Sequence, residues 1–328
     1  MAGRGSRLRP HTLTVPKPML AIAGKPIVQR IVEQLAQSCP DGVEEVAFII
    51  GDFGEAVEAQ LQEVAQSVGA KASIYHQEAP LGPAHAIYCA QESLSGPSIV
   101  AFADTLFKAD FEFPEAADGI IWVKRVKDPS SFGVVKTNEE GIITDFVEKS
   151  PVFVSDLAIV GIYYFKEAAQ LRDTIKHMLD NEIRDKGEYQ ITTALELLKN
   201  NGTGFRAATI EEWLDCGNKT NVINTNQRIL QLSTNQQLIA GTAVIDNAVV
   251  IPPCYIGDHA TIQNAVVGPY VSIGDNSTIE DSVIQNSVVQ NNSTVQNALL
   301  ENSMLGNLVD YQGKKSEISI GDYSKYTT

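Results

Sequence analysis

The first third of the chain alternates short apolar runs with amphipathic segments. Residues 46–50 and 98–103 are apolar runs bounded by polar residues, a pattern that predicts buried strands. Residues 53–68 carry apolar side chains every three or four positions, which predicts an amphipathic helix. A further strand is expected over 72–75 and a further helix over 83–94. This alternation predicts an α/β fold with a doubly wound, mixed but mostly parallel, Rossmann-like sheet.

The pattern changes after residue 119. Four apolar stretches follow one another with short turns up to residue 165, which predicts an antiparallel or mixed extension of the sheet. Helices are then expected over 167–181, 189–200 and 218–238, with short strands over 205–210 and 213–214.

A period of six begins beyond residue 243. The aliphatic residues that carry it, with one five-residue step after Ile262 and a shorter step after Ile279, are Val244, Val250, Ile256, Ile262, Val267, Ile273, Ile279, Val283, Val289 and Val295. One short strand per hexapeptide predicts a parallel β-helix, and a valine-rich β-sandwich is the alternative. The predicted organisation is a domain over 1–240, a β-helix over 241–310 and a polar tail over 311–328.

Composition narrows the classes of partner. The 328 residues include 25 basic and 40 acidic side chains, and the net charge of −15 argues against nucleic-acid or anionic-membrane binding. No apolar run reaches the roughly 18 residues of a membrane span, and the basic N-terminus lacks the apolar core of a secretory signal. The four cysteines (Cys39, Cys89, Cys216 and Cys254) have no zinc-binding spacing. Reduced thiols and a cytoplasmic location are therefore expected.

The N-terminal segment gathers cations in an acidic chain. Gly3 and Gly5 precede Ser6 and Arg7, and Lys17 follows within a Pro-Lys-Pro cluster. Glycines let backbone N–H groups approach phosphates, and Arg7 and Lys17 add positive charge, so a polyphosphate ligand is indicated. The segment is not a Walker loop, because GxxxxGK[ST] is absent.

This segment resembles the signature loop of the sugar-phosphate nucleotidyltransferases, G-x-G-[TS]-R-L-x-P-x-T followed by P-K-P. The resemblance implies transfer of a nucleotidyl group from a pyrimidine nucleoside triphosphate, dTTP or UTP, to a sugar 1-phosphate such as glucose 1-phosphate. It assigns catalytic roles to Arg7 and Lys17, and nucleotide contacts to Gly3, Gly5 and Ser6. It also implies that the C-terminal β-helix is left-handed.

Residues 77–86 resemble the family's base-binding segment, in which Gln77 would hydrogen-bond a pyrimidine and Gly82 would let the base pack on the backbone. His85 makes this segment more similar to the uridylyltransferase than to the thymidylyltransferase branch. A turn followed by the start of a helix is the plainer interpretation of these residues.

Two aspartates follow strand-like segments. Asp104 ends a predicted buried strand, where α/β sheets bind ligands, and Asp215 lies in Trp-Leu-Asp-Cys-Gly. They match the family's two metal aspartates, with Ala103 in place of the usual glycine. Mg²⁺ prefers such hard oxygen ligands beside phosphate, so a Mg²⁺ cofactor is expected. A turn or cap is the ordinary role of a lone aspartate at Asp104.

Five further residues match family positions around the sugar phosphate: Gly133, Glu148, Lys149, Gly161 and Glu188. Glutamate can accept hydrogen bonds from sugar hydroxyls, and lysine can bind the phosphate. A solvated edge, a backbone turn and a carboxylate at a helix N-terminus are the alternatives for these positions.

Two other functions remain open. One is a non-catalytic sugar-nucleotide-binding regulatory protein, and the other is a bifunctional enzyme whose β-helix transfers an acyl group with His259 as base. A structural role is the plainer interpretation of His259, as are turn positions for Asn264, Asn286, Asn291 and Asn297. Binding of a nucleoside triphosphate and a sugar 1-phosphate is expected, with a homo-oligomer formed through the β-helix.

Family members carry about six apolar residues before the signature loop, which form a central strand, whereas Met1 lies inside the motif here. Such a strand would contribute roughly 5–10 kcal/mol, at about 1.5–3 kcal/mol per buried side chain. The expectation is therefore that the chain is truncated at its start.

Overall fold

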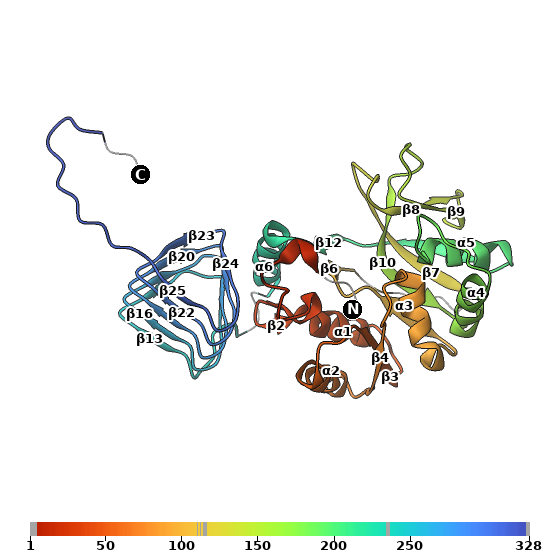
Figure 1. Ribbon diagram of the computed structural model, residues 1–328, viewed down its shortest axis with the longest axis horizontal. Coiled ribbons are helices and arrows are strands. Elements are labelled where there is room, and N and C mark those ends of the chain that lie inside the picture. The colour runs from red at the N-terminus through yellow and green to blue at the C-terminus, as the bar shows by residue number, and fades with distance from the viewer. Residues whose placement is uncertain (1–4, 110, 112, 114–116, 234–236, 326–328) are drawn as a thin grey trace. The chain divides into compact units, whose positions relative to one another are not determined.

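The structure is a computed structural model that describes residues 5–109, 111, 113, 117–233 and 237–325. The chain forms two compact units (Figure 1). The first spans Met1–Leu20 and Lys25–Asn218, and the second spans Ala21–Gly24 and Lys219–Thr328. In the described part of the chain, no helix combines the length and apolarity that a bilayer crossing requires.

The first unit alternates helices and strands as the sequence predicts. Its helices are α1 (Ile27–Gln37), α2 (Glu55–Ser67), α3 (Pro83–Cys89), α4 (Ala168–Asp180) and α5 (Ile191–Asn200), with 3₁₀ turns η1 (Ser6–Leu8), η2 (Lys17–Met19) and η3 (Gln91–Ser93). Its strands are β2 (Lys25–Pro26), β3 (Glu45–Ile50), β4 (Lys71–His76), β5 (Ser98–Ala101), β6 (Thr105–Lys108), β7 (Gly119–Arg125), β8 (Gly133–Thr137), β9 (Ile143–Glu148), β10 (Leu157–Phe165), β11 (Phe205–Thr209) and β12 (Glu212–Asp215).

The central sheet of this unit is mixed. Its order is β11-β7-β10-β8-β9, with β5 also paired to β10. Strand β10 is antiparallel to β7 and β8, as the succession of short turns over 119–165 predicts. It is also antiparallel to β5, and β11 is parallel to β7. Strands β3 and β4 form a separate parallel pair, and β6 and β12 an antiparallel one. The α/β class is confirmed, but antiparallel pairings are more prominent than a mostly parallel sheet implies.

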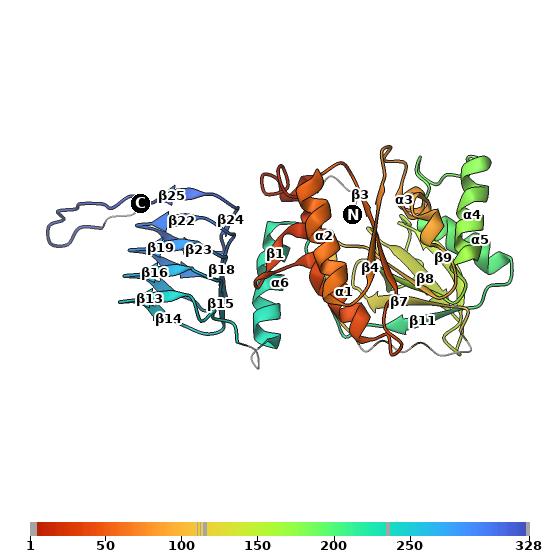
Figure 2. The same ribbon diagram turned by 90° about the horizontal axis from the view of Figure 1, so that it is seen from below.

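Helices lie against the strands of the first unit (Figure 2), and their contacts are apolar. Helices α3, α4 and α5 pack against the central sheet around a core that includes Ile121, Tyr163 and Leu195. Helices α1 and α2 form a second core with β3, in which Leu61 and Phe48 are buried. The predicted 3.6-residue period of 53–68 is therefore the buried face of α2.

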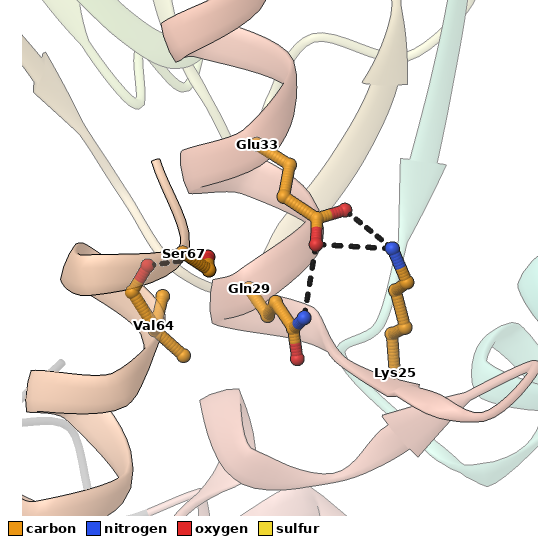
Figure 3. Close-up of polar contacts among 5 residues, drawn as sticks. All are labelled: Lys25, Gln29, Glu33, Val64 and Ser67. Carbon is orange, nitrogen blue, oxygen red and sulfur yellow. Dashed lines mark hydrogen bonds and ion pairs between the residues drawn. The ribbon is translucent and has the colours of Figure 1, made fainter. Parts of the chain in front are cut away.

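Polar contacts occur separately at α1, which Lys25 of β2 precedes, and within α2 (Figure 3). Lys25 Nζ lies 2.8 Å and 3.0 Å from the two carboxylate oxygens of Glu33, and Gln29 Nε2 donates to the same carboxylate at 2.9 Å. The Ser67 hydroxyl donates to the Val64 carbonyl at 2.7 Å. Lys25 of β2 thus has a carboxylate partner on the helix that follows it, α1, although it follows the cationic N-terminal segment closely in sequence.

The second unit contains β1 (Ala21–Ile22), α6 (Lys219–Leu232) and the predicted parallel β-helix (Figure 1). The strands of the β-helix are β13 (Val244–Asp246), β14 (Val249–Val250), β15 (Cys254–Ile256), β16 (Thr261–Gln263), β17 (Val266–Val267), β18 (Val271–Ile273), β19 (Thr278–Glu280), β20 (Val283–Gln285), β21 (Val288–Val289), β22 (Thr294–Gln296), β23 (Leu299–Glu301), β24 (Met304–Leu305) and β25 (Asp310–Gln312). They stack in register as three parallel sheets, β13-β16-β19-β22-β25, β14-β17-β20-β23 and β15-β18-β21-β24.

The phase of the apolar repeat needs one correction. Val244 and Val283 are exposed, although the six-residue period predicts that they point inward, and Ile284 is the buried residue of its strand. The reason is the coil length. Val244 pairs with Thr261, 17 positions on, whereas Thr278 pairs with Thr294, 16 positions on. These coils are one and two residues shorter than three hexapeptides, so the inward-facing phase moves from coil to coil.

Asparagines build the turns between coils. Asn264, Asn286 and Asn297 have positive φ, which asparagine adopts more readily than most residues. Asn291 instead accepts a hydrogen bond from Asp275 N at 3.0 Å. His259 also has a positive φ, of 56°, and its backbone N–H donates to Thr242 Oγ1. This turn geometry supports the structural interpretation of His259.

Asn226 of α6 is fully buried in the second unit and connects three of its segments. Its Oδ1 accepts from Ala23 N at 3.0 Å and from Ser272 Oγ of β18 at 2.7 Å. Gln290 Nε2 donates to Ala21 O at 3.1 Å on the same side. These bonds join residues 21–24 to the β-helix, although more than two hundred positions separate them in sequence.

Asn226→Ala is expected to lower the free energy of unfolding of this unit by about 2–4 kcal/mol, because two buried donors lose their acceptor. Denaturant unfolding would measure the change. Asn224→Ala, at an exposed position of the same helix, is the matched control and is expected to change it by about 0.5 kcal/mol or less. Equal effects of the two substitutions would contradict the role given to Asn226.

Candidate active site

The N-terminal segment forms a tight turn in the first unit. Gly5 has φ 56°, and its carbonyl accepts hydrogen bonds from Leu8 N at 3.0 Å and Thr12 Oγ1 at 2.7 Å. Ser6 begins η1, and Arg7 is exposed in it without a hydrogen bond or ion pair to any described residue. Gly3 lies outside the described residues. The guanidinium of Arg7 is therefore available to an anion from solvent.

Lys17 and Asp104 form an ion pair. Lys17 begins η2, where Pro16 sets the entry to the turn, and its side chain is 10% exposed. Its Nζ lies 3.3 Å from Oδ2 of Asp104, whose side chain is 53% exposed. A buried ammonium thus faces a carboxylate that remains open to solvent.

Asp215 lies next to Asp104 across two paired strands. Strand β12 runs antiparallel to β6 with Asp215 opposite Thr105, and Cys216 N donates to Asp104 O at 3.3 Å. The carboxylate of Asp215 accepts from Gly217 N at 2.8 Å. The structure thus brings together two aspartates that lie 111 positions apart in sequence.

This pair fits a magnesium ion by its chemistry. Both side chains offer carboxylate oxygens, and Mg²⁺ commonly uses one or two carboxylates together with waters and substrate phosphates. No group of three or more potential ligands (His, Cys, Asp or Glu) occurs among the described residues, so an all-protein cage is not present there. The donor set suits a metal shared with a phosphate ligand.

Gly133 and Glu148 meet on β8 and β9, where they are register partners. The Glu148 side chain is 9% exposed; one carboxylate oxygen accepts from Thr192 Oγ1 at 2.9 Å, and the other lies 3.2 Å from Lys149 Nζ. A Cβ at Gly133 would lie 3.1 Å from that carboxylate and 3.0 Å from Thr192 Cγ2. A side chain larger than that of glycine at 133 would therefore press on the Glu148 carboxylate and on Thr192.

Lys149 and Gly161 have special backbone conformations. Lys149 has φ 41° and a half-exposed side chain, and Lys186 Nζ donates to its carbonyl at 2.7 Å. Gly161, φ 89°, lies at the register shift of β10, and Phe102 N donates to its carbonyl at 2.8 Å. The positive φ at this bulge is sufficient reason for a glycine at 161. A contact of Gly161 with the sugar therefore stays a prediction.

Gly82 packs against the segment that carries Glu188. Its φ is 117°, and a Cβ there would lie 2.7 Å from the carbonyl oxygen of Tyr189 and 3.0 Å from the Cβ of Glu188. Tyr189 N donates to Leu81 O, and Ala84 N donates to Tyr189 O, both at 2.9 Å. Gln77 Nε2 donates to Gly82 O at 3.1 Å, so the predicted base-binding pair is in contact.

Two interactions connect these groups. Burial, and then the charges of Glu148 and Asp104, raise the pKa of Tyr163 above its ordinary value, so both carboxylates act on one buried phenol. The rings of Phe132, which precedes Gly133, and Trp213 are 4.9 Å apart. Glu148 and Asp104 therefore both influence Tyr163, and the neighbours of Gly133 and Asp215 in sequence are in ring contact.

Three residues beside the predicted groups have no role assigned from the sequence: Thr192, Thr105 and Gly217, the last of these only as part of a motif. Thr192 orients Glu148, Thr105 Oγ1 accepts from Trp213 Nε1 at 2.9 Å, and Gly217 orients Asp215. The Trp-x-Asp-x-Gly spacing was a usable signal for Gly217. Thr192 and Thr105 carry no signal in sequence, because their partners are brought in by tertiary contacts.

Gly82→Ala is expected to destabilise the first unit by about 1–3 kcal/mol, because φ 117° disfavours a side chain and the Cβ would overlap Tyr189. Thermal or denaturant unfolding would measure it. Gly202→Ala, with φ 102° but open space around its Cβ, isolates the backbone cost. A loss no larger than that of Gly202→Ala would contradict the close packing on Tyr189.

Comparisons with known proteins show the family of the chain. Residues 1–232 match the model of a family described as Nucleotidyl transferase. The chain is 34% identical to the mannose-1-phosphate guanylyltransferase catalytic subunit beta of Danio rerio, over 79% of this chain and 72% of that protein. It is 31% identical to a glucose-1-phosphate thymidylyltransferase of Streptomyces antibioticus, with the same two coverages. In fold it is similar to a UDP-glucose pyrophosphorylase crystallised with UDP-glucose, with a TM-score of 0.58 and 23% identity over 70% of this chain and 96% of that one.

Proposed function

Because the chain belongs to the nucleotidyl transferase family, we propose that it transfers a nucleotidyl group from dTTP or UTP to a sugar 1-phosphate, with glucose 1-phosphate as acceptor. Its homologues are sugar-1-phosphate nucleotidyltransferases, and the chain is an enzyme of that class. The pyrimidine base and the glucose unit are the parts of the proposal that go beyond the family.

One observation carries the proposal. The ammonium of Lys17 lies 3.3 Å from Asp104, and Asp215 lies on the strand paired beside Asp104. The ammonium of Lys17 and the carboxylates of Asp104 and Asp215, together with the turn at Gly5, suit a chain of phosphates with a bound cation.

In the proposed reaction, a phosphate oxygen of the sugar 1-phosphate attacks the α-phosphorus in line. A phosphorus–oxygen bond to the sugar phosphate forms, the bond to the β-phosphate breaks, and pyrophosphate leaves with its electron pair. The chain supplies orientation and charge neutralisation rather than a covalent intermediate. Arg7 would balance charge on the pyrophosphate side, and Lys17 would contact the attacking phosphate or the α-phosphate.

Asp104 and Asp215 would hold the divalent ion that the family generally uses, and the fit of their oxygens supports Mg²⁺. Once bound, the ion would neutralise charge on the α-phosphate. Gly5 and Ser6, together with Gly3, would lie along the phosphates, and Gln77 and Gly82 would contact the base. Glu148 and Lys149 would bind the sugar phosphate, with Gly133 leaving room and Gly161 and Glu188 lining the same region.

A grid of nucleoside triphosphates (UTP, dTTP, GTP, CTP and ATP) against glucose 1-phosphate and mannose 1-phosphate, scored by pyrophosphate release, tests the proposal. We expect the highest kcat/KM for UTP or dTTP with glucose 1-phosphate. A clear preference for GTP or for mannose 1-phosphate would overturn the substrate assignment. The absence of pyrophosphate release in every cell would favour the regulatory alternative.

The proposal includes a cytoplasmic homo-oligomer formed through the β-helix. An outward column of stacked apolar residues, Val249, Val266, Val283 and Leu299, supports such an interface, and Leu299 is 83% exposed. Apolar surface arranged in a column is typical of contacts between proteins. Sedimentation of the whole chain would give the oligomeric state, and a monomer at micromolar concentration would contradict this part.

A further inference from the structure

The side-chain amide of Gln77 is held by two acceptors. Gln77 follows β4, and its backbone N–H donates to Ile50 O at 2.8 Å, which places it at the end of the β3–β4 pair. Its Nε2 lies 3.1 Å from Gly82 O and 3.0 Å from His85 Nδ1. An amide nitrogen carries two hydrogens and no acceptor site. Both hydrogens of Gln77 are therefore directed at atoms of this chain.

The chemistry of the partners fixes the direction of the amide. If the amide were reversed, its oxygen would face the carbonyl oxygen of Gly82, and two acceptors would repel each other. Gly82 itself cannot move away easily, because its backbone packs against Tyr189. The carbonyl oxygen Oε1 of Gln77 is thus the atom left over, and among the described residues none donates a hydrogen bond to it.

His85 can accept this bond only when its Nδ1 carries no proton. The half-buried position of the ring lowers the pKa of His85 below its ordinary value, which favours the neutral imidazole. With Nδ1 as acceptor, the proton of the neutral ring lies on Nε2. The surroundings of His85 therefore favour the form that the contact with Gln77 needs.

We propose that His85 is a positioning residue that holds Gln77 so that only its acceptor oxygen faces the base, which selects bases with a ring N–H. Uracil, thymine and guanine have such a donor at the centre of the Watson–Crick edge, whereas cytosine and adenine have a lone pair there. The inference rests on the proposed function for one point, namely that Gln77 contacts the base.

Without His85, the preference for bases with a ring N–H over bases with a ring lone pair would weaken. One hydrogen of Nε2 would lose its partner and become available to a ligand, and the amide would have one bond fewer to hold its direction. The ring lone pair of cytosine or adenine could then accept a hydrogen bond from that N–H. The preference for UTP over CTP would fall, whereas binding of the sugar phosphate, which uses other residues, would not change.

The test compares the wild-type chain with His85→Leu and His85→Ala, which remove the acceptor, and His85→Asn, whose side-chain oxygen can replace Nδ1. The readout is the ratio of kcat/KM for UTP to that for CTP with glucose 1-phosphate. We expect both removal variants to lower this ratio about tenfold or more, because Gln77 would no longer be forced to set its acceptor oxygen against the ring lone pair of cytosine. His85→Asn is expected to keep the ratio within about threefold of wild type. His177→Ala is the matched control, since His177 Nδ1, on α4, also contacts a side-chain amide, that of Asn181 directly after the helix.

Equilibrium binding of UTP and CTP to the same variants separates this inference from the proposed function. If no pair of substrates releases pyrophosphate, the proposed reaction is wrong. A binding preference for UTP that falls in His85→Leu and is kept in His85→Asn would still support the role of His85. Equal losses for UTP and CTP, or a His85→Asn variant as impaired as His85→Leu, would overturn it. So would a wild-type chain that binds both nucleotides equally. Leu is close in volume to His, so at least one removal variant is expected to fold, and circular dichroism would verify this.

Discussion

Asp104→Asn is expected to lower kcat by about 10²–10³-fold, the usual cost of losing one electrostatic group at a phosphoryl or acyl centre. Asparagine keeps the size of the side chain and removes its charge. The ion pair with Lys17 and the affinity for a divalent ion are then lost together, whereas the backbone bond from Cys216 N to Asp104 O is kept. Pyrophosphate release measured over a range of Mg²⁺ concentrations would show both the lower kcat and a weaker response to the metal.

Asp156→Asn is the matched control for this substitution. Asp156 forms an exposed ion pair with Arg125 at 2.6 Å, and exposed pairs contribute only about 0–1 kcal/mol. We expect its turnover to stay within about twofold of wild type, since no substrate group is placed near it. Near-normal turnover of Asp104→Asn would remove Asp104 from the site, and an equal loss in Asp156→Asn would reduce the effect to general destabilisation.

Lys17→Met is expected to lower kcat by a similar factor of about 10²–10³, because in the proposed reaction its ammonium, which is held by a buried stem, contacts a phosphate. The effect should fall on kcat more than on KM if Lys17 acts on the transition state. Lys17→Arg should not restore activity, since the planar guanidinium does not match the position of a compact ammonium. Single-turnover measurement of pyrophosphate release would separate the chemical step from product release.

Lys25→Met is the control for the lysine. Lys25 is also paired with a carboxylate, that of Glu33, but in a half-exposed position (Figure 3). Its loss is expected to cost about 1 kcal/mol or less of stability and to leave kcat unchanged. The double variant Asp104→Asn with Lys17→Met should be much less impaired than the product of the two single effects, because paired residues act as a unit. Full additivity would contradict a shared role.

Much of the site could be predicted because its motifs are local. Arg7 and Lys17 lie in one continuous segment, and the spacing of glycine, arginine and proline is visible without any fold. Asp104 could be placed at the carboxyl end of a strand from the apolar run before it. Asp215 needed the family's Trp-x-Asp-x-Gly pattern, since nothing in the surrounding residues relates it to Asp104.

The β-helix shows the limit of periodicity. A six-residue repeat correctly predicts parallel coils, but the inward residue of β20 is Ile284 rather than Val283. The repeat is averaged over coils of 17 and 16 residues, and only the backbone register shows where a residue is lost. Because successive side chains of a strand point to opposite faces, an error of one position exchanges core for surface.

Taken alone, the sequence determined the α/β class, the β-helix, the family and the identity of the charged groups, because these depend on short-range patterns. Only the tertiary structure decided that Lys17 pairs with Asp104 and that Thr192 donates a hydrogen bond to Glu148. The same is true of the contacts of the Gln77 amide with Gly82 and His85. Such contacts depend on strand register, bulges and the packing of α5 on the sheet. These are properties of the whole chain, and no local window of residues encodes them.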